Sequence, residues 1–477
     1  MGRSVRSWLL VVLAVVAVLA ASGFSAGKSA SSGGWDKAVT VAGIAKSGGE
    51  TSVISCASPG NCVAAGEFSA KSGIKVFVLS QVRGTWGKPS VLPGTAPTSK
   101  TGGAAAGIAC PSAGRCVVVG SYTDAAGHNQ AFISRQVRGT WRKLSWVPGL
   151  ARLDRGHNAG LDYLSCPSAG NCSAEGAYTD GSGNGHPFVV TQVRGTWGQV
   201  TTVPAATGLP GQAAGNVPSI GPISCPSPGN CSAAGTYAVS GGGQVFVDNE
   251  VHGAWTAEAV PGLATLNVGL QDSINAISCP SAGNCGAGGA YVAADGAMDS
   301  FVVNETHGTW GTATEVKTKI PGFNADDGDW ITAMSCPSAG NCTAGGEQNV
   351  EQDAINSSVY VLSEVHGTWG KAILVNGMSK LNQGDYATIS QVSCSSAGNC
   401  GIAGYYNAGP NEDLIYTQPY VADQVKGTWS KAIEVPGIKT VPESQGQNAD
   451  TTTISCPAPN RCGAGGGNGT AFVVTQL

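Results

Sequence analysis

The sequence is poor in charge and has no basic cluster. Only 12% of its 477 residues are charged, the formal net charge is −4, and no block of Lys and Arg follows the N-terminus. Nucleic-acid-binding surfaces are usually basic, so we expect no nucleic-acid partner, and an anionic membrane surface is disfavoured for the same reason. The apolar content of 42% is ordinary, which excludes a disordered polar chain.

Long apolar runs are also scarce, and the clearest one lies at the N-terminus. Residues 8–21 are apolar, follow two arginines and precede small residues. The run is short for a membrane span, which needs about 20 residues, so the pattern predicts a signal peptide over 1–23 and a flexible leader over 24–34. Cleavage after Ala20 or Gly23 fits, and an uncleaved anchor is the alternative. We expect a secreted, extracellular protein without a membrane span after cleavage; association with the cell wall stays open.

Zinc-ligand spacings are missing although the chain has sixteen cysteines. The cysteines form eight C-x5-C pairs, whereas zinc sites favour C-x2–4-C, and the six histidines show no matching spacing. Regular, even-numbered cysteines in an exported chain indicate disulfides. The predicted pairs are Cys56/Cys62, Cys110/Cys116, Cys166/Cys172, Cys225/Cys231, Cys279/Cys285, Cys336/Cys342, Cys394/Cys400 and Cys456/Cys462.

The cysteine pairs mark a repeat of 54 to 62 residues, a period typical of solenoids and propellers. Each copy contains four strand-like segments: one that ends at the first Cys, one rich in Ala and Gly, one apolar, and one that runs from a Trp such as Trp86 to a Val-Pro-Gly variant. A Gly recurs in the Cys loop, and Asn460 replaces it in the last copy, which predicts a shared left-handed backbone position. Small residues after the second Cys predict close packing against a backbone or a large ring.

Four antiparallel strands per repeat are typical of propeller blades, with a linear solenoid as the alternative. The eighth copy ends after its third strand at 472–477, whereas residues 33–43 match the fourth strand at 427–437 in phase. A ring needs such a shared blade and an open solenoid does not. The sequence therefore predicts an all-β, eight-bladed propeller over 35–477, a single domain closed by the N-terminal strand in the last blade.

Strand alternation predicts two unlike faces. The Cys loops and the Arg-Gly-Thr-Trp turns share a face that is nearly invariant between copies, and we expect each disulfide to staple a hairpin turn there. The other face carries loops of variable length. Binding residues usually lie on variable loops held by a rigid frame, so we expect the site on the variable face at the channel mouth. His252, His307 and His366 occupy a slot that holds Arg or Lys elsewhere, and we interpret them as turn residues.

Three groups of candidate binding residues lie in the variable connections. The acidic loop that contains Asp326, Asp327 and Asp329 is the best position for Ca2+, although a solvated turn explains it equally, and we expect no cofactor. Arg152 and Arg155, beside Asp154 and His157, suit an anionic ligand or a solvated loop. The aromatic candidates either stack on a sugar ring or pack between blades: Tyr163, Trp330 and Tyr386.

The Cys loop (SCPSAGNC) and the Gly-Thr-Trp turn (GTWGKA-VPG) together resemble exported actinobacterial repeat proteins over residues 35–477. That resemblance implies a secreted propeller and no known activity. A looser likeness links the turn at Ser80, Gly84, Thr85 and Trp86 to the Asp-box of sialidase-type propellers. The Asp of that motif is missing here, and we find no arginine triad, so the likeness is one of fold alone.

These observations predict a binding or scaffold protein, expected to be a monomer, that recognises an extracellular polysaccharide or protein. No convergent catalytic set is evident, so we name no catalytic residue. Two alternatives are a secreted glycan-active hydrolase or lyase, which needs two carboxylates about 5–10 Å apart at the channel mouth, and a structural protein of the cell envelope.

Overall fold

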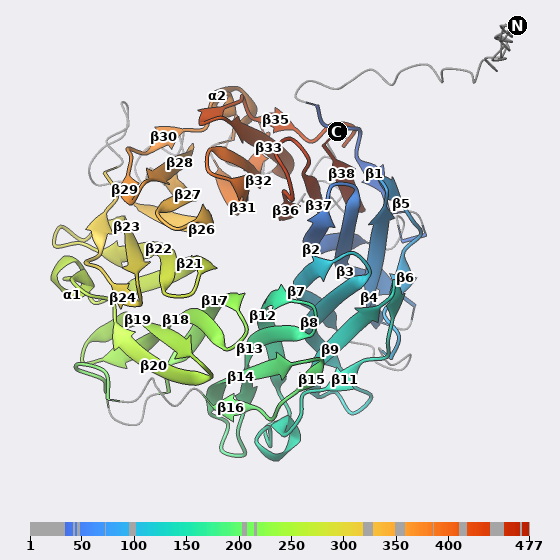
Figure 1. The fold of residues 1–477 in the computed structure, drawn as a ribbon, viewed down its shortest axis with the longest axis horizontal. Helices are drawn as coiled ribbons and strands as arrows, with labels where there is room; N and C mark the ends of the chain where they lie inside the picture. Colours follow the sequence, from blue (N-terminus) through green and yellow to red (C-terminus); the bar gives the residue numbers. More distant parts are fainter. Residues whose placement is uncertain are drawn as a thin grey trace, which may run out of the picture.

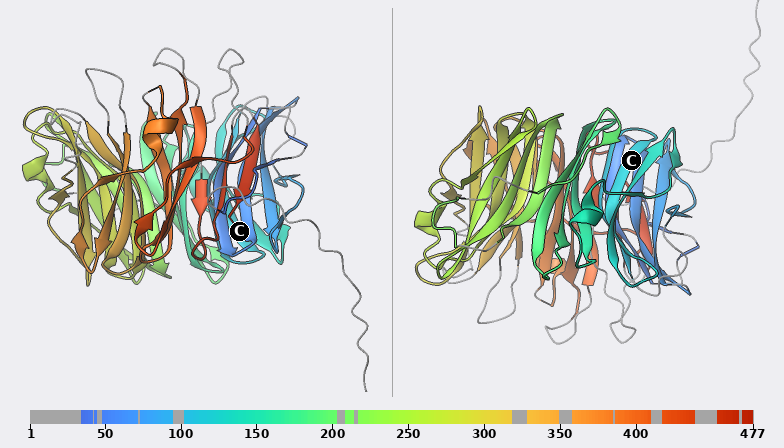
Figure 2. Two further views of the ribbon diagram at one scale, coloured as in Figure 1. Left: turned by 90° about the horizontal axis from the view of Figure 1, so that it is seen from above. Right: turned by 90° about the horizontal axis from the view of Figure 1, so that it is seen from below.

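The computed structural model describes residues 34–41, 43–44, 48–71, 73–94, 102–202, 208–213, 217–317, 328–348, 358–384, 386–409, 417–438, 453–467 and 470–476. These residues form eight antiparallel sheets that stand around a central axis as the blades of a disc (Figures 1 and 2). The predicted eight-bladed β-propeller is therefore confirmed. The predicted signal peptide over 1–23 lies outside the described residues.

Each blade runs from an innermost strand A to an outermost strand D, and blades are numbered along the chain (Figure 1). Blade 1 consists of β2 (Gly49–Ser58), β3 (Asn61–Ala70), β4 (Gly73–Val82), β5 (Thr85–Trp86) and β6 (Ser90–Val91), and blade 2 of β7 (Gly103–Ser112), β8 (Arg115–Thr123), β9 (Asn129–Val137), β10 (Thr140–Trp141) and β11 (Ser145–Trp146). Blade 3 consists of β12 (Ala159–Ser168), β13 (Asn171–Thr179), β14 (Gly185–Val193), β15 (Thr196–Trp197) and β16 (Thr201–Thr202). Blade 4 consists of β17 (Ser219–Ser227), β18 (Asn230–Val239), β19 (Gly242–Val251) and β20 (Ala254–Ala259).

Blades 5 to 8 continue the same order, and the last one takes its D strand from the N-terminus. Blade 5 consists of β21 (Asp272–Ser281), β22 (Asn284–Val292), β23 (Met298–Thr306), β24 (Thr309–Trp310) and β25 (Thr314–Glu315), and blade 6 of β26 (Asp329–Ser338), β27 (Asn341–Gln348), β28 (Ser358–Val365), β29 (Thr368–Trp369) and β30 (Ile373–Leu374). Blade 7 consists of β31 (Ala387–Ser396), β32 (Asn399–Asn407), β33 (Thr417–Val425), β34 (Thr428–Trp429) and β35 (Ile433–Glu434). Blade 8 consists of β36 (Thr453–Ser455), β37 (Gly463–Gly467), β38 (Ala471–Thr475) and β1 (Val39–Thr40).

In the described parts of the chain, helix is confined to three single turns between blades: η1 (Leu150–Arg152), α1 (Leu263–Leu266) and α2 (Met378–Leu381). Among the described residues, no helix has the length and apolar character needed to cross a membrane.

The ring closes as predicted. Strand β1 pairs antiparallel with β38, with Val39 opposite Val473, and Trp35 forms an isolated bridge with Gln476. The Trp35 side chain is 1% exposed, and its indole Nε1 donates to Oδ2 of Asp423 in blade 7 at 2.9 Å. Gln476 Nε2 donates to the same oxygen at 2.9 Å. One carboxylate of blade 7 therefore binds residues from both ends of the described chain.

Small residues in strand B make room for a bulge in strand A. In blades 1 to 7 the A–B register shifts once in mid-strand, which leaves a residue of strand A unpaired. A Cβ atom on Gly66 would lie 1.9 Å from the carbonyl oxygen of Glu50, and one on Gly289 would lie 1.8 Å from that of Ser273. A large ring of strand C, such as Phe132 beside Gly120, adds to the crowding in several blades. Both predicted reasons for the small residues are confirmed.

All eight predicted disulfides form, and no described cysteine is free. They join Cys56 to Cys62, Cys110 to Cys116, Cys166 to Cys172, Cys225 to Cys231, Cys279 to Cys285, Cys336 to Cys342, Cys394 to Cys400 and Cys456 to Cys462.

One end of every disulfide lies in the protein core. The second cysteine of each pair lies at the N-terminal end of strand B, and its exposed fraction is only 2 to 6%. These buried cysteines are Cys62, Cys116, Cys172, Cys231, Cys285, Cys342, Cys400 and Cys462. Each disulfide nevertheless joins the two sides of the Cys-loop hairpin, as Cys56 opposite Cys62 joins β2 to β3. The predicted staple of this turn is therefore confirmed, and its second cysteine is a core residue.

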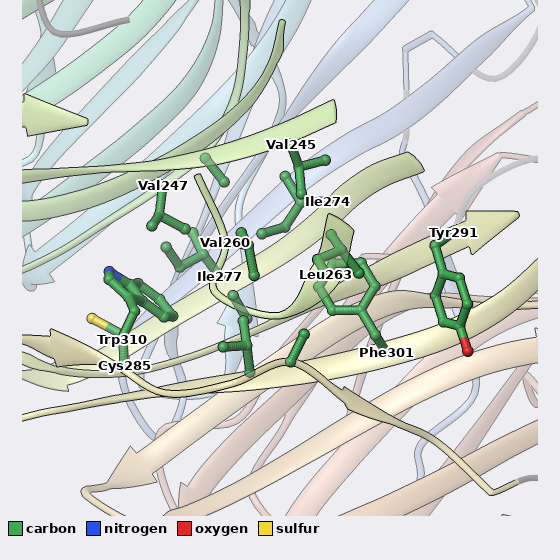
Figure 3. Packing of buried hydrophobic residues seen from close by; sticks show 14 of the residues in the cluster. Val245, Val247, Val260, Leu263, Ile274, Ile277, Cys285, Tyr291, Phe301 and Trp310 are labelled. Atoms are coloured by element: carbon green, nitrogen blue, oxygen red, sulfur yellow. The ribbon is translucent and has the colours of Figure 1, made fainter. Parts of the chain in front are cut away.

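Several disulfides pack between blades. A Cβ on Gly286 of blade 5 would meet the sulfur atoms of Cys342 and Cys336 at 2.9 and 3.0 Å. The core between blades 4 and 5 also joins side chains of both sheets, such as Val245 and Ile274 (Figure 3). The disulfides thus supply apolar volume at seams where glycine and alanine leave little.

The Ser that precedes the first Cys links most blades to the next. Its hydroxyl accepts a hydrogen bond from the backbone N–H of the following blade's first Cys, as from Cys110 to Ser55 at 3.0 Å. The same contact joins Ser165 to Cys225, Ser224 to Cys279, Ser278 to Cys336, Ser335 to Cys394, Ser393 to Cys456 and Ser455 to Cys56. Blade 2 has Ala109 at this position, which has no hydroxyl group to accept a hydrogen bond from the backbone N–H of Cys166.

The Cys loop and the C–D turn lie on one face, as predicted. In blade 1 the backbone N–H of Gly84 donates to the carbonyl of Gly60 at 2.9 Å, and the equivalent glycines pair in blades 2 to 7. The Asn of the Cys loop fixes the same contact: Asn61 Oδ1 accepts from Arg83 N. Gly60 has φ +71° and Asn460 has φ +55°, which confirms the shared left-handed position.

Strand D departs from the prediction of one continuous strand. In most blades it consists of two short pieces that both pair with strand C, as β5 and β6 pair with β4. Four residues separate Trp86 from Ser90, whereas three separate their partners Gln81 and Val78, so one residue bulges out. Blade 4 is the exception, because it has one residue fewer after Trp255 and β20 pairs without interruption.

Candidate binding clefts

The structure has clefts at the seams between neighbouring blades, on the face of the Cys loops. We name them by the blades they separate: cleft 4/5 has a volume of about 650 Å³, cleft 5/6 about 320 Å³, cleft 6/7 about 470 Å³ and cleft 8/1 about 610 Å³. These volumes lie in the range of small-molecule sites.

Three of the clefts are built from the same repeat positions. Each is lined by the Pro and Asn of one blade's Cys loop, by the acidic residue before that blade's C–D turn, and by glycine of the next blade's Cys loop. The acidic residues are Glu250 in cleft 4/5, Glu305 in cleft 5/6 and Glu364 in cleft 6/7. Equivalent positions thus produce equivalent clefts at these three successive seams.

The C–D turns divide the ring into two kinds of blade. Blades 1 to 3 carry Gln-x-Arg-Gly at 81–84, 136–139 and 192–195, whereas blades 4 to 6 carry Glu-x-His-Gly at 250–253, 305–308 and 364–367. The Arg and His residues all have φ between 49° and 52°, which confirms that the histidines are turn residues. His307 and His366 nevertheless also line clefts.

In six of the eight blades the Gln or Glu at this position hydrogen-bonds with a residue of the preceding blade, and its chemistry matches that residue. Glutamine meets an acceptor: Gln81 Nε2 donates to Thr475 Oγ1 at 2.8 Å. Glutamate meets a donor: Asn249 Nδ2 donates to Glu305 at 2.9 Å. The other matched pairs are Gln136 with Ser80, Glu364 with Asn304, Gln424 with Ser363 and Gln476 with Asp423.

Gln192 and Glu250 show no such hydrogen bond. For Glu250 the equivalent residue of the preceding blade is Thr191, whose hydroxyl hydrogen-bonds with Ser173 at 3.3 Å. Glu250 is 4% exposed, and its Oε2 is buried without a hydrogen-bond partner.

A buried polar atom that lacks a partner costs free energy. One oxygen at the same position also lacks a partner in other blades, among them Gln81 Oε1 and Glu305 Oε2. Glu250 differs from Glu305 and Glu364 because it has no asparagine donor across the seam.

Burial raises the pKa of the acids at these seams. It raises the pKa of Glu305 to about 7, helped by the nearby charge of Glu258, while the hydrogen bond from Asn249 opposes the shift. Burial likewise raises the pKa values of Glu250 and Glu364. The carboxyl groups of blades 4 to 6 therefore titrate closer to neutral pH than free glutamates do.

A further acid pair lies between blades 3 and 4 and is closed to solvent. Glu175 and Asp248 are both 0% exposed, and none of their four carboxylate oxygens has a hydrogen-bond partner. Burial raises the pKa of Asp248 to about 7, with a contribution from Glu250, and raises that of Glu175 well above its usual range. Since neither side chain is exposed, this pair does not form the accessible carboxylate pair that a glycan-active enzyme needs.

The predicted variable-face residues are dispersed around the ring. Arg152 and Arg155 are exposed beside η1, and Asp154 accepts the backbone N–H of Asn158 at 2.9 Å. His157 stacks on His128 with ring centroids 4.1 Å apart. No described contact gathers these side chains into one pocket with the aromatic candidates.

The aromatic candidates lie near the innermost strands of three different blades. Tyr163 is 39% exposed on β12, and Tyr386 is 40% exposed beside Tyr405, with ring centroids 5.9 Å apart. Trp330 is half-buried on β26 and its indole donates to Glu347. Because two of the three keep substantial exposure, stacking on a ligand stays a prediction for this face.

The predicted acidic loop is only partly described. Asp326 and Asp327 lie outside the described residues. Asp329 is 2% exposed, and its carboxylate accepts both the backbone N–H and the hydroxyl of Ser300, at 2.9 and 2.7 Å. It begins a buried strand, which is a structural position. Within the described part of the chain, no three His, Cys, Asp or Glu residues converge closely enough to hold a metal ion.

Comparisons with known proteins identify the fold. No protein family and no curated protein matches the sequence. Sqt1 of Chaetomium thermophilum is 11% identical, with 91% of this chain and 97% of that chain covered and a TM-score of 0.50.

Two other solved structures are more distant. The Aleuria aurantia lectin, described as a six-bladed β-propeller with a novel fucose recognition mode, is 14% identical over 68% of this chain and 92% of that chain, with a TM-score of 0.35. The Hadza microbial sialidase Hz136 is 10% identical over 86% and 74%, with a TM-score of 0.39. These likenesses concern the propeller fold alone, and the resemblance to exported actinobacterial repeat proteins stays a prediction.

Proposed function

We propose that this protein is a secreted binding protein that recognises a repeating polysaccharide through the clefts between its blades. The observation that carries the proposal is the recurrence of one cleft, built from the same repeat positions, at three successive seams. An array of equivalent sites suits a ligand whose own units repeat, because several weak contacts to one polymer add up to strong binding. A folded protein partner offers no such periodicity.

An extracellular location is part of this proposal. Eight disulfides support it, because disulfides persist in oxidising compartments. The apolar N-terminal segment supports it as a signal peptide. The clefts on the Cys-loop face replace the variable face as our leading site, since the variable-face candidates that are described do not converge.

Exposed residues beside the clefts allow a direct test. Val251, Thr306 and Val365 occupy equivalent positions between the Glu and the His of each turn, line the three clefts and are exposed. Replacing all three by Trp fills the clefts without disturbing a buried residue. We expect V251W/T306W/V365W to lose most of its affinity for a bound polysaccharide, measured by affinity electrophoresis against a panel of cell-wall and capsular polysaccharides.

The repeats supply a matched control. V82W/V137W/V193W places the same substitutions at the same turn position in blades 1 to 3, away from the three clefts. We expect this control to bind like the wild type. Equal binding by both triple variants, or no binding to any polysaccharide by the wild type, would contradict the proposal.

A further inference from the structure

Cleft 4/5 has the most carboxylates of the described clefts. Three glutamates line it, Glu250, Glu258 and Glu305, and no Lys or Arg stands among its described lining residues. Cleft 5/6 has two, Glu305 and Glu364, and also lacks Lys and Arg in its described lining. Cleft 6/7, by contrast, is lined by Lys371 and Lys426 as well as by Glu364. Cleft 4/5 therefore presents an excess of carboxylates, and cleft 6/7 balances its single carboxylate with two cations.

The third carboxylate of cleft 4/5 follows from the missing residue in blade 4. Because β20 has no bulge, its side chains alternate regularly, and Thr256 and Glu258 are exposed on the same side. Both line the cleft. In blade 6 the bulged stretch after Trp369 brings Gly370 and Lys371 to the equivalent wall instead. A one-residue difference in length thus places a carboxylate where a neighbouring blade has a cation.

Glu250 supplies an independent observation that points to a ligand. It lines the cleft, yet it is only 4% exposed, and its Oε2 has no hydrogen-bond partner. The glutamines of blades 1 to 3, blade 7 and blade 8 also keep one buried oxygen without a partner, but they carry no charge. Among the three acids at this position, Glu305 and Glu364 accept a hydrogen bond from an asparagine, and Glu250 does not. The last torsion of a glutamate is soft, so a group bound in the cleft can engage either carboxylate oxygen. Natural sequences break a local rule mainly where function requires it.

We infer that cleft 4/5 binds the primary ammonium group of an amino-sugar unit, an inference that rests on the proposed polysaccharide-binding function. An ammonium group offers three hydrogen-bond donors and one positive charge, which complements three carboxylates that lack cationic partners in the cleft. Hydrogen bonds between charged groups are the strong ones. The hydroxyls of Ser232 and Thr256, which also line the cleft, can pair with sugar hydroxyls.

The test uses the full-length mature protein and simple sugars. Isothermal titration compares glucosamine, N-acetylglucosamine and glucose, which differ only in the group that meets the carboxylates. We expect glucosamine to bind, and its affinity to fall about tenfold in Glu250→Gln and in Glu258→Gln, because each loses a charge-assisted hydrogen bond. Acetylation removes the ammonium charge, so N-acetylglucosamine should bind no better than glucose.

Matched variants keep the result interpretable. Glutamine is the natural residue at the position of Glu250 in five other blades, so Glu250→Gln should fold, which its melting temperature verifies. Glu364→Gln makes the same change in cleft 6/7 and should leave glucosamine affinity within about twofold of the wild type. Affinity that drops equally in Glu364→Gln would overturn the assignment to cleft 4/5.

Further outcomes separate this inference from the proposed function. Tighter binding of a short lysine peptide than of glucosamine oligomers, or displacement of glucosamine by CaCl2 at low millimolar concentration, would overturn the amino-sugar assignment. Polysaccharide binding that depends on the three clefts but shows no preference for free amines would overturn this inference and leave the proposed function intact. Glucosamine binding without any polysaccharide binding would overturn the proposed function and leave the assignment of an ammonium site to cleft 4/5 intact.

Discussion

Blades 1 to 3 and blades 4 to 6 share one backbone but solve the same seam with opposite chemistry. In the first set a neutral glutamine donates to a hydroxyl of the preceding blade, as Gln136 does to Ser80. In the second set a glutamate accepts from an asparagine, as Glu364 does from Asn304. Geometry therefore does not require the acids. The acidic half has buried groups that titrate and clefts lined by carboxylates, and we attribute this difference to function rather than to folding.

The two halves should differ most in their response to pH. The folded pKa values of Glu305 and Asp248 are about 7, above the 4.5 and 3.8 of unfolded chains. The folded state therefore holds more protons between pH 4 and 7, and its stability is greatest below the unfolded pKa and falls as pH rises through the folded pKa. We expect a loss on the order of 3–5 kcal/mol between pH 5 and pH 8, measured by urea unfolding at each pH.

The acidic half should account for much of this loss. The variant E250Q/E305Q/E364Q converts it to the chemistry of the neutral half, and its stability should depend less steeply on pH. A residual slope is expected from Asp248, which this variant keeps, and from Glu67 and Asp272, whose pKa values burial also raises to about 7. A wild type whose stability is flat or rises from pH 5 to pH 8 would contradict the assignment.

Breaking one matched pair should cost more in the acidic half than in the neutral half. Asn304 donates to Glu364 at 2.5 Å and accepts from Trp369 Nε1 at 3.1 Å. Asn304→Leu leaves both groups buried without partners, and we expect it to lower the free energy of unfolding by about 2–4 kcal/mol. Ser80→Ala removes only the 3.4 Å contact from Gln136 and should cost about 0.5–1 kcal/mol. Equal losses of unfolding free energy in Asn304→Leu and Ser80→Ala, measured by chemical denaturation, would contradict this difference between the acidic and the neutral blades.

Replacing the unmatched acid should stabilise the fold. Glu250→Gln replaces a buried carboxylate by a neutral amide, whose Nε2 can donate across the seam as Gln81 Nε2 donates to Thr475. The amide oxygen stays without a partner, as Gln81 Oε1 does, so the gain comes from removing the buried charge. We expect a gain of about 1 kcal/mol, read from the melting temperature at pH 8. A gain together with weaker glucosamine binding is the signature of a residue kept for function; a loss of stability would show that the acid has a structural partner.

Exchanging the turn residue should have the smallest effect. His307 and Arg83 adopt the same backbone conformation, with φ of 52° and 49°, and both side chains are exposed. His307→Arg should change the free energy of unfolding by less than about 0.5 kcal/mol. A larger effect in thermal unfolding would show that the imidazole has a structural role beyond the turn.

The repeat explains why the fold could be predicted and the site could not. Eight copies of one pattern fix the blade count, the disulfide pairing and the phase, and the phase shows that Trp35 completes the last blade. The bulge in strand D was missed because its cause, one extra residue after the Trp, leaves no mark in hydrophobic alternation. The clefts were missed because they join residues of adjacent copies. The pairing of Gln with Arg and of Glu with His was visible in the sequence, but its meaning depends on which blade each side chain faces.

The burial of the disulfides has the same cause. Spacing within one copy pairs Cys62 with Cys56, but it does not show that the neighbouring blade covers Cys62, which is 2% exposed. The covering residue is Gly463 of blade 8, where a Cβ would meet both sulfur atoms of this disulfide at 3.0 and 3.1 Å. Cys62 and Gly463 are about 400 residues apart in sequence. The burial of this disulfide therefore depends on a contact that the spacing of cysteines within one copy does not reveal.

The variable-face candidates show the opposite limit. The acidic loop at 326–329 suggested a calcium site by composition alone. Asp329 instead begins a strand, and its carboxylate accepts hydrogen bonds from the backbone N–H and the hydroxyl of Ser300. The composition of the loop does not reveal this contact, because Ser300 comes from another segment of the chain. Asp326 and Asp327 lie outside the described residues, so that part of the hypothesis stays a prediction.

The hydrogen bond from Trp35 to Asp423 spans 388 residues of sequence. Contacts of such separation form late, because the entropy of closing a long loop must be lost before they contribute. During synthesis the N-terminal strand therefore stays without its partner until blade 8 has been made. An unpaired strand is the kind of surface that recruits other chains. The step that seals the ring is thus also the step at which one copy of the protein has to be kept apart from the next.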